Sequence, residues 1–490
     1  MYFSLLYIIF KNSTFFYHIL QLTLHIINTL LLFLVFSRFV ERKIAFFSSL
    51  IFLVHPMQVE SVSYIAATGN PLFFLFGITA FLLSMNNLNW KKLCIISALL
   101  LFSLLTKEAG VIFLFIVFLY RFLFKRKQII PLFLAESVSL LLYSLIRFGI
   151  GGVFFSTLPL VPIARLSLVQ RLINIPVIIF YYLKTFLFPV DLAIDQQWTI
   201  NKVNFSNFYL PLIVDLLFVI LVTILGTYIY KKYKDEIKIY LFFVAWFIFG
   251  MLLYLQIFPL DGTVADRWFY FPIVGLLGIL GIGIHLIKSN HKIIKKISYL
   301  LIIFLVILFS IRTITRNTNW YDPITLYTND IKISDNFDIE NVIGTEYVGL
   351  HEYSNAIEHS KKSVELFPYE ANMYNLANAY EWTGNIQESI KYYSLALASK
   401  NYISMDHDHF LATYMELSHT LYLAGRYDDA IVIVKRGLGD YPDSGELWKA
   451  LAMDEYKLGN REKAFSAVTK AKMYLPDDQI DSIYLQIQGK

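Results

Sequence analysis

Histidine and carboxylate side chains at the ends of apolar segments are the first candidates for chemistry in this sequence. His55 and Glu60 are five residues apart, and Pro56 between them ends any helix that precedes it. We therefore expect both side chains near one surface. The pair fits a metal site, acid–base chemistry or a polar lock that holds the turn. Spacing alone favours the lock and leaves the other two interpretations open.

A lysine–glutamate pair occupies a very short turn between two apolar runs. Lys107 and Glu108 are adjacent there, and ionisable groups near membrane depth usually mark function because they are costly to bury. One interpretation is an ion pair in which the two residues neutralise each other. The other is that Lys107 binds an anionic head group such as phosphate.

A third charged segment precedes an aromatic run. Asp261, Asp266 and Arg267 come directly before a Trp-Phe-Tyr sequence that ends at Tyr270. Arginine beside aromatic residues at an interface suits a lipid-linked phosphate, whereas the aromatic residues alone would be ordinary interfacial anchors.

Other polar residues carry weaker signals. Asp191 and Asp195 follow a proline in a long segment, and solvation in a loop is their default interpretation. His25 and Asn28 share one helix face at a spacing of three residues, which more often indicates hydrogen bonding between helices than catalysis.

The elements that position these groups are membrane helices. Hydrophobic residues make up 57% of the 490 residues and charged residues only 16%, values typical of a polytopic membrane protein. The net charge is +5, and no basic stripe with interleaved aromatics suggests nucleic-acid binding. The single cysteine cannot form an intramolecular disulfide.

Five clusters of cations set the expected topology, because short basic loops face the cytoplasm. They lie near residues 38–43, 91–92, 125–127, 231–238 and 288–296. We predict ten or eleven membrane segments, with residues 171–188 as a re-entrant or interfacial helix on the outer side. The apolar runs are roughly 15–37, 44–55, 71–86, 93–106, 109–124, 129–148, 207–230, 239–258, 268–287 and 296–315. The motifs above and everything after about residue 316 then lie outside the cytoplasm. We favour a bacterial plasma membrane, with the endoplasmic reticulum as the alternative.

The chain ends in a repeat array. Gly425, Ala430 and Pro442 recur 34 residues later as Gly459, Ala464 and Pro476, which is the tetratricopeptide period. We predict an all-α protein with a membrane domain over 1–315, a linker over 316–336 and about four repeats over 337–490. The aromatic residues expected to contact a protein or peptide partner are Tyr380, Tyr414 and Trp448.

Taken in order, these segments resemble the polytopic protein O-mannosyltransferases with C-terminal tetratricopeptide repeats, and their bacterial relatives. The resemblance spans nearly the whole chain, and the ordered set is far more specific than any single motif. The matching stretches include Tyr17-His18, His25 to Asn28, His55-Pro56, Glu60 to Val62, Thr106 to Gly110, Tyr181-Tyr182, Phe188 to Leu192, Ala265 to Tyr270 and Asn319 to Asp322.

The resemblance implies a GT-C-type glycosyltransferase that uses a polyprenyl-phosphate-linked sugar as donor. It implies that His55, Glu60 and Asp266 are catalytic, with metal binding by His55 and Glu60 left open. Lys107 and Arg267 would hold the donor phosphate as it leaves, while a carboxylate would deprotonate the acceptor hydroxyl. The further substrate-binding residues that it implies are Glu108, Tyr270 and Asp191.

Two departures from the family pattern separate the functional hypotheses. The family's acidic residues of the first outer loop have no counterpart here, so we expect the N-terminus to be truncated relative to the family. Gly69-Asn70-Pro71 also stands where relatives usually have Gly-Arg and an acidic residue. The leading hypothesis is a glycosyltransferase, and the alternative is a non-catalytic membrane scaffold. A ligase or polymerase of lipid-linked glycans ranks third.

Overall fold

The computed structural model describes residues 2–154, 161–287, 292–399 and 407–488. Within these ranges the chain is helical, and the only β-type pairing is an isolated bridge between Gln196 and Val264. The prediction of an all-α protein is confirmed. The chain divides into two compact units, Met1–Ser334 and Asp335–Lys490.

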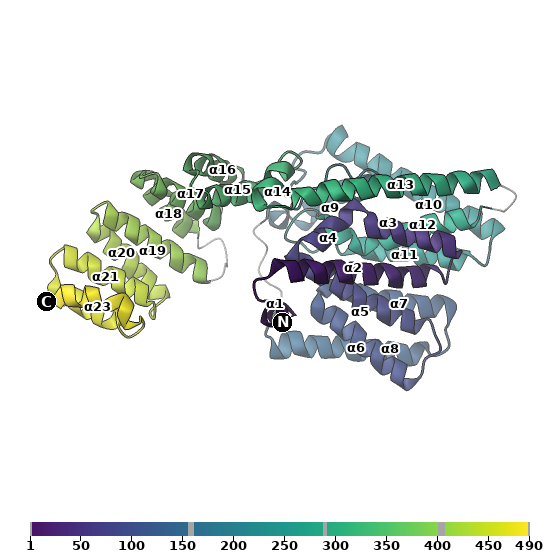
Figure 1. The fold of residues 1–490 in the computed structure, drawn as a ribbon, viewed down its shortest axis with the longest axis horizontal. Coiled ribbons are helices and arrows are strands. Elements are labelled where there is room, and N and C mark those ends of the chain that lie inside the picture. The colour runs from purple at the N-terminus through teal and green to yellow at the C-terminus, as the bar shows by residue number, and fades with distance from the viewer. Residues whose placement is uncertain (1, 155–160, 288–291, 400–406, 489–490) are drawn as a thin grey trace. The chain divides into compact units, whose positions relative to one another are not determined.

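Unit 1 contains fourteen α-helices in the described ranges (Figure 1). They are α1 (Tyr2–Phe10), α2 (Thr14–Phe36), α3 (Arg42–Val54), α4 (Val59–Ser63), α5 (Gly69–Ser84), α6 (Trp90–Thr106), α7 (Val111–Phe124), α8 (Ile129–Ser144), α9 (Leu168–Leu187), α10 (Leu210–Lys232), α11 (Ile237–Leu252), α12 (Pro272–His285), α13 (Lys292–Asn319) and α14 (Pro323–Asp330). Short helical turns lie between them, and three of these carry site residues: η1 (Pro56–Gln58), η3 (Glu108–Gly110) and η7 (Asp266–Tyr270).

Fewer helices can cross a membrane than the ten or eleven that we predicted. In the described part of the chain, five are long and apolar enough. A sixth results if α3 and the segment Pro56–Ser63, which meet at a bend of 53°, count as one span. The five are Thr14–Phe36, Ile65–Ser84, Ile129–Ile150, Phe205–Lys232 and Lys296–Asn319. The protein is therefore a multi-pass membrane protein with several shorter apolar helices packed among the spans.

The shorter helices have a physical cause. A helix of 14 residues such as α7 or α12 is only about 21 Å long, less than the roughly 30 Å of a bilayer core. The chain before each of them forms a 3₁₀ turn, η3 before α7 and η7 before α12. Irregular backbone at membrane depth is stable only where protein surrounds it, so these turns must be covered by neighbouring helices. The expected re-entrant segment is a continuous helix, α9, with Pro176 inside it.

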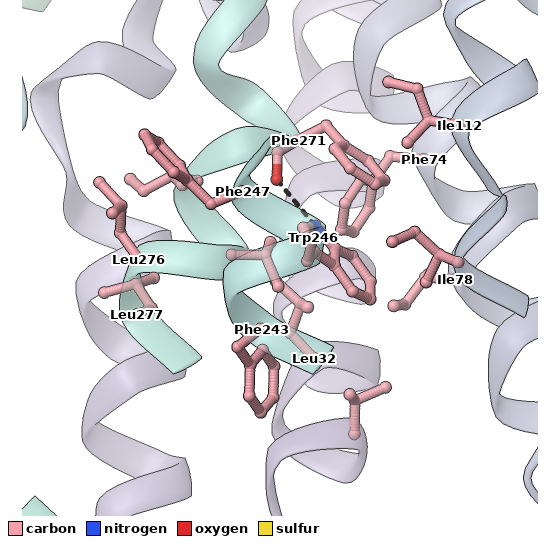
Figure 2. Packing of buried hydrophobic residues seen from close by; sticks show 14 of the residues in the cluster. Leu32, Phe74, Ile78, Ile112, Phe243, Trp246, Phe247, Phe271, Leu276 and Leu277 are labelled. Atoms are coloured by element: carbon pink, nitrogen blue, oxygen red, sulfur yellow. Dashed lines mark hydrogen bonds between the residues drawn. The ribbon is translucent and has the colours of Figure 1, made fainter. Parts of the chain in front are cut away.

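The core of unit 1 holds η7 in place. Trp246 of α11 is fully buried, and its indole N–H donates to the carbonyl oxygen of Phe271 at 3.1 Å (Figure 2). The Phe271 ring stacks on that indole with the centroids 4.9 Å apart. On the next turn, a Cβ at Gly275 would lie 2.5 Å from the backbone nitrogen of Phe247. Helices α11 and α12 are therefore in backbone contact, which fixes the chain directly after η7.

Unit 2 is a series of helical hairpins (Figure 1). Its helices are α15 (Phe337–Gly349), α16 (Tyr353–Leu366), α17 (Glu370–Trp382), α18 (Ile386–Ala398), α19 (His407–Leu423), α20 (Tyr427–Asp440), α21 (Gly445–Lys457), α22 (Arg461–Ala471) and α23 (Asp477–Gln488). Gly384, Gly425 and Gly459 have φ of +74°, +72° and +80° at the turns, a conformation that favours glycine. Ala430 and Ala464 are fully buried where paired helices meet. The helical solenoid predicted from the 34-residue period is confirmed.

The segment 316–336, which we expected to be a linker, contains regular structure. Helix α13 continues to Asn319, and α14 follows within unit 1. Arg316 and Asp330 form a buried ion pair, with Nη2 donating to Oδ2 at 2.8 Å. The boundary between the two units therefore lies at residues 334–335.

Candidate functional site

A buried ion pair joins the first and third charged motifs. Glu60 of α4 forms an ion pair with the Arg267 guanidinium, and its Oε2 also accepts the Arg267 backbone N–H at 2.8 Å. The Glu60 side chain is 2% exposed and that of Arg267 19%. The carboxylate of Asp261, which is mostly exposed, forms a second ion pair with Arg267, with Oδ2 3.5 Å from Nη2. The contact brings together segments that are 207 residues apart in sequence.

The second charged motif adds a cation to this pair. Lys107 Nζ donates to Asn70 Oδ1 at 2.6 Å, and no ion pair engages it among the described residues. Burial, and then repulsion from Arg267, lower the pKa of Lys107 to about 8. A neutral amide, that of Asn70, thus holds the amine. The ammonium faces a second cation and has no direct anionic partner.

The position of Lys107 depends on the next glycine. Helix α6 ends at Thr106, and Lys107 adopts an extended conformation with φ −156° before η3 begins. A Cβ at Gly110 would lie 2.6 Å from the backbone of Ser103 in α6. Only glycine allows the turn to fold back so closely on the helix, and this return directs Lys107 towards α5.

Asp266 lies next to Arg267 but is held by a different element. It is 3% exposed, and the Tyr181 hydroxyl of α9 donates to its Oδ1 at 2.5 Å. The Gln196 amide donates to the same tyrosine at 3.0 Å. Burial, and then the nearby Glu60 carboxylate, raise the pKa of Asp266 to about 8. A carboxyl group with that pKa can exchange a proton near neutral pH.

His55 and Glu60 do not form the pair that their spacing suggested. His55 Nδ1 accepts the Met57 backbone N–H at 3.3 Å, so Nε2 carries the proton that it donates to the Phe186 carbonyl at 3.0 Å. Both ring nitrogens are engaged and the ring is fully buried. This arrangement is the polar lock, and no potential metal-ligand cluster in the described residues includes His55 or Glu60.

Three further candidates lie apart from the cluster. Glu108 pairs with Arg147 and not with Lys107, so of the two interpretations of the Lys107–Glu108 turn the mutual ion pair does not hold. Asp191 is exposed and pairs with Lys184 at 2.6 Å. Tyr270 is buried in the core.

The Tyr270 hydroxyl lies 2.9 Å from His25 Nδ1 and accepts from the Asn28 amide at 3.0 Å. His25 and Asn28 therefore make the interhelical hydrogen bonds expected of them.

A cavity of about 600 Å³ lies on the other face of α4, and His25 and His55, which the sequence singled out, are among the residues that line it. Gln58 lines it, is 2% exposed, and has no hydrogen-bond partner for its amide among the described residues. His18, Asn317 and Trp320 also line it, together with apolar side chains of α2 and α4. Helix α4 thus separates a neutral cavity from the charged cluster.

The aromatic residues predicted to bind a partner contribute mainly to packing. Tyr414 is fully buried and donates to Asp440 at 2.9 Å, and the Tyr380 ring stacks on Tyr392. Trp448 donates to the Pro442 carbonyl at 2.9 Å. Unit 2 has a groove of about 270 Å³ on other residues of α19 and α21. Its lining residues include Met415, Glu416, His419, Tyr422, Glu446, Lys449, Met453 and Asp454.

Comparison with known proteins agrees with the motifs. No family model matches the chain. The human "Protein O-mannosyl-transferase TMTC3" is 22% identical over an alignment of 520 residues, which covers 96% of this chain and 56% of that protein. The chain is similar to protein O-mannosyl-transferases. A Caenorhabditis elegans protein O-mannosyl-transferase, F38B6.6, is 24% identical over 346 residues, or 68% of this chain and 47% of that protein.

The resemblance inferred from the ordered motifs is thus confirmed, and the chain spans about half the length of the curated relatives it matches. Among solved structures, MamA is 21% identical with a TM-score of 0.28, covering 30% of this chain and 84% of that chain. The tetratricopeptide protein YrrB is 16% identical with a TM-score of 0.30, covering 34% and 82%. Because these TM-scores are low, the assignment of the repeats depends on the 34-residue period of the sequence and on the helical hairpins of unit 2.

The ion pair gives a prediction about stability. Glu60→Gln removes the charge that Arg267 faces, and breaking a buried pair from one side costs about 3 kcal/mol. We expect a lower midpoint of thermal unfolding for the purified protein in detergent. The double variant Glu60→Gln/Arg267→Met should lose less stability than the single variant, because no unpaired charge remains. A double variant less stable than either single variant would contradict this account.

Proposed function

We propose that the protein is a membrane glycosyltransferase that transfers a sugar, mannose-like by family analogy, from a polyprenyl-phosphate donor to a hydroxyl of an extracytoplasmic protein. The observation that carries the proposal is the convergence of Lys107 and Arg267 in a cluster where Lys107 has no anionic partner. Two cations in such proximity are stabilised by an anion between them, and a phosphate supplies that charge. The names of the relatives support the same class of reaction.

In the proposed reaction the acceptor oxygen attacks the anomeric carbon of the donor. The bond between that carbon and the phosphate oxygen breaks, and the phosphate leaves with the bonding electrons. Lys107 and Arg267 stabilise the developing negative charge on the phosphate. The acceptor proton passes to the ionised form of Asp266, whose raised pKa makes that carboxylate a good proton acceptor.

Glu60 has a positioning role in this proposal. It holds Arg267 by both the guanidinium and the backbone N–H, so its own oxygens are engaged and it is not free to take a proton. His55 likewise holds the turn before α4 and takes no part in the chemistry.

The repeats and the cellular location complete the proposal. We place the charged cluster and unit 2 outside the cytoplasm, where the repeats would bind the acceptor protein. The curated relatives matched here are animal proteins, which supports the endoplasmic reticulum membrane over the bacterial plasma membrane that we favoured from composition.

Removing either proposed phosphate-binding cation should abolish transfer. We expect Lys107→Met and Arg267→Met to lower the rate of sugar transfer from a polyprenyl-phosphate donor by at least about 100-fold. Lys184→Met is the matched control, because Lys184 pairs with the exposed Asp191 away from the cluster. The measurement is transfer of a radiolabelled sugar by purified protein in lipid nanodiscs. Transfer that is unchanged in both cluster variants would favour the non-catalytic scaffold.

Donor binding should weaken as the pH rises through about 8. The pKa of Lys107 lies below its usual 10.5, so the ammonium is mostly present at pH 7 and mostly lost at pH 9. The donor is a phosphodiester whose single charge is constant over this range, so the change reports on the protein. Lys107→Arg should reduce the pH dependence between 7 and 9, since a guanidinium does not titrate there, and the dependence that remains reports on Asp266, whose pKa is also about 8. Equal pH dependence in the two proteins would contradict the assignment of Lys107.

A further inference from the structure

Two helices of the repeat array bring three metal-ligating side chains together. Glu381 is in the last turn of α17, and Glu416 and His419 lie three residues apart on one face of α19. One ligand atom from each residue can be chosen so that all three lie within 4.8 Å of one another. No other group of this kind occurs in the described part of the chain. The cluster belongs to unit 2 alone and is separate from the charged cluster of unit 1.

His419 and Glu381 are spaced like two ligands of one metal ion. His419 Nδ1 lies 3.3 Å from Glu381 Oε1, slightly longer than most N–H···O hydrogen bonds. Two ligands on a tetrahedral zinc ion, each about 2.1 Å from the metal, are separated by about 3.4 Å. A small inward movement of Glu416 would complete three ligands.

A buried tyrosine orients the first carboxylate. The Tyr393 hydroxyl of α18 donates to Glu381 Oε2 at 3.1 Å, and Tyr393 is fully buried. This bond occupies one oxygen of Glu381 and leaves Oε1 directed at His419. Hydrogen bonds from outside a metal site commonly fix its carboxylate and histidine ligands in this way.

The cluster also lacks compensating positive charge. No hydrogen bond or ion pair engages the Glu416 carboxylate among the described residues, although Glu381 is its neighbour. Asp454 of α21 lines the same groove as Glu416 and His419. It is 1% exposed, and its Oδ1 has no hydrogen-bond partner among the described residues. The groove's one lysine, Lys449, is close to Glu446 and pairs with it.

We propose that this groove binds a divalent cation of the zinc class through His419 Nδ1, Glu381 Oε1 and the Glu416 carboxylate. Three protein ligands leave a fourth coordination position for water or for a group of a bound partner. Asp454 lines the same groove and, when ionised, adds negative charge that favours a cation. The ion would link α17 to α19. This proposal is independent of the proposed sugar transfer.

Zinc binding to the full-length protein tests the proposal. Protein in detergent is treated with a chelator, dialysed and titrated with Zn²⁺ by calorimetry, and its unfolding midpoint is measured with and without Zn²⁺. We expect about one high-affinity ion per chain and a higher unfolding midpoint. Glu416→Gln and His419→Gln should each weaken binding by at least about 10-fold and remove the zinc-dependent shift.

The control is His351→Gln, because His351 is in the same unit and its Nδ1 contacts only the Tyr353 hydroxyl. It should bind Zn²⁺ like the wild type. Glu416→Gln keeps the side-chain shape and removes a like charge beside Glu381, so we expect it to fold. If it does not, Glu381→Gln replaces it with the same expected loss. Equal zinc affinity in wild type, Glu416→Gln (or Glu381→Gln) and His419→Gln would overturn the proposal. So would the absence of binding at micromolar Zn²⁺, as expected if the groove takes only a cationic peptide.

Discussion

The ion pair between Glu60 and Arg267 is the contact on which the rest of unit 1 depends. It joins the turn after α3 to the turn before α12, and each partner is costly to bury without the other. Because Glu60 also accepts the Arg267 backbone N–H, the pair fixes the course of η7 as well as a side chain. Asp266 is the next residue along that backbone. Its contact with Tyr181 therefore depends on the same anchor.

Broken helices explain how charged residues can occupy this depth. Helices α7 and α12 are too short to span a bilayer, and each is preceded by a 3₁₀ turn that packs against other parts of unit 1. Backbone groups left without a helical partner at these breaks must form hydrogen bonds within the protein. At the start of α12, for example, the Trp246 indole N–H donates to the Phe271 carbonyl oxygen. In unit 1, α7 and α12 are therefore short, and the turns before them bring polar backbone groups and charged side chains together.

The sequence predicted the helices and turns better than it predicted which side chains contact one another. Apolar runs located the helices, and the glycines at 384, 425 and 459 located the turns, because both signals are local. Fewer of the described helices have the length of a full span than the number of apolar runs suggested, since hydropathy does not show where a helix breaks. A Lys107–Glu108 ion pair was one of two interpretations of the sequence, but Glu108 binds Arg147 and Lys107 binds Asn70, because partner choice depends on how distant helices pack. The unpartnered Gln58 had no local pattern that would reveal it, and in the cluster at His419 only the three-residue spacing of Glu416 and His419 is local, because Glu381 comes from another helix.

Asp330 has a mechanical consequence. One carboxylate holds Arg316 of α13 and also accepts the backbone N–H of Ile194, so α13, α14 and the chain at residue 194 are tied at one point. Two residues further on, Gln196 bridges to Val264 and donates to the Tyr181 hydroxyl. The end of α14 is therefore connected, through Ile194 and Gln196, to the tyrosine hydroxyl that contacts Asp266. A displacement of Asp330 would reach that hydroxyl through two hydrogen-bonded steps, although the two residues belong to distant segments of unit 1.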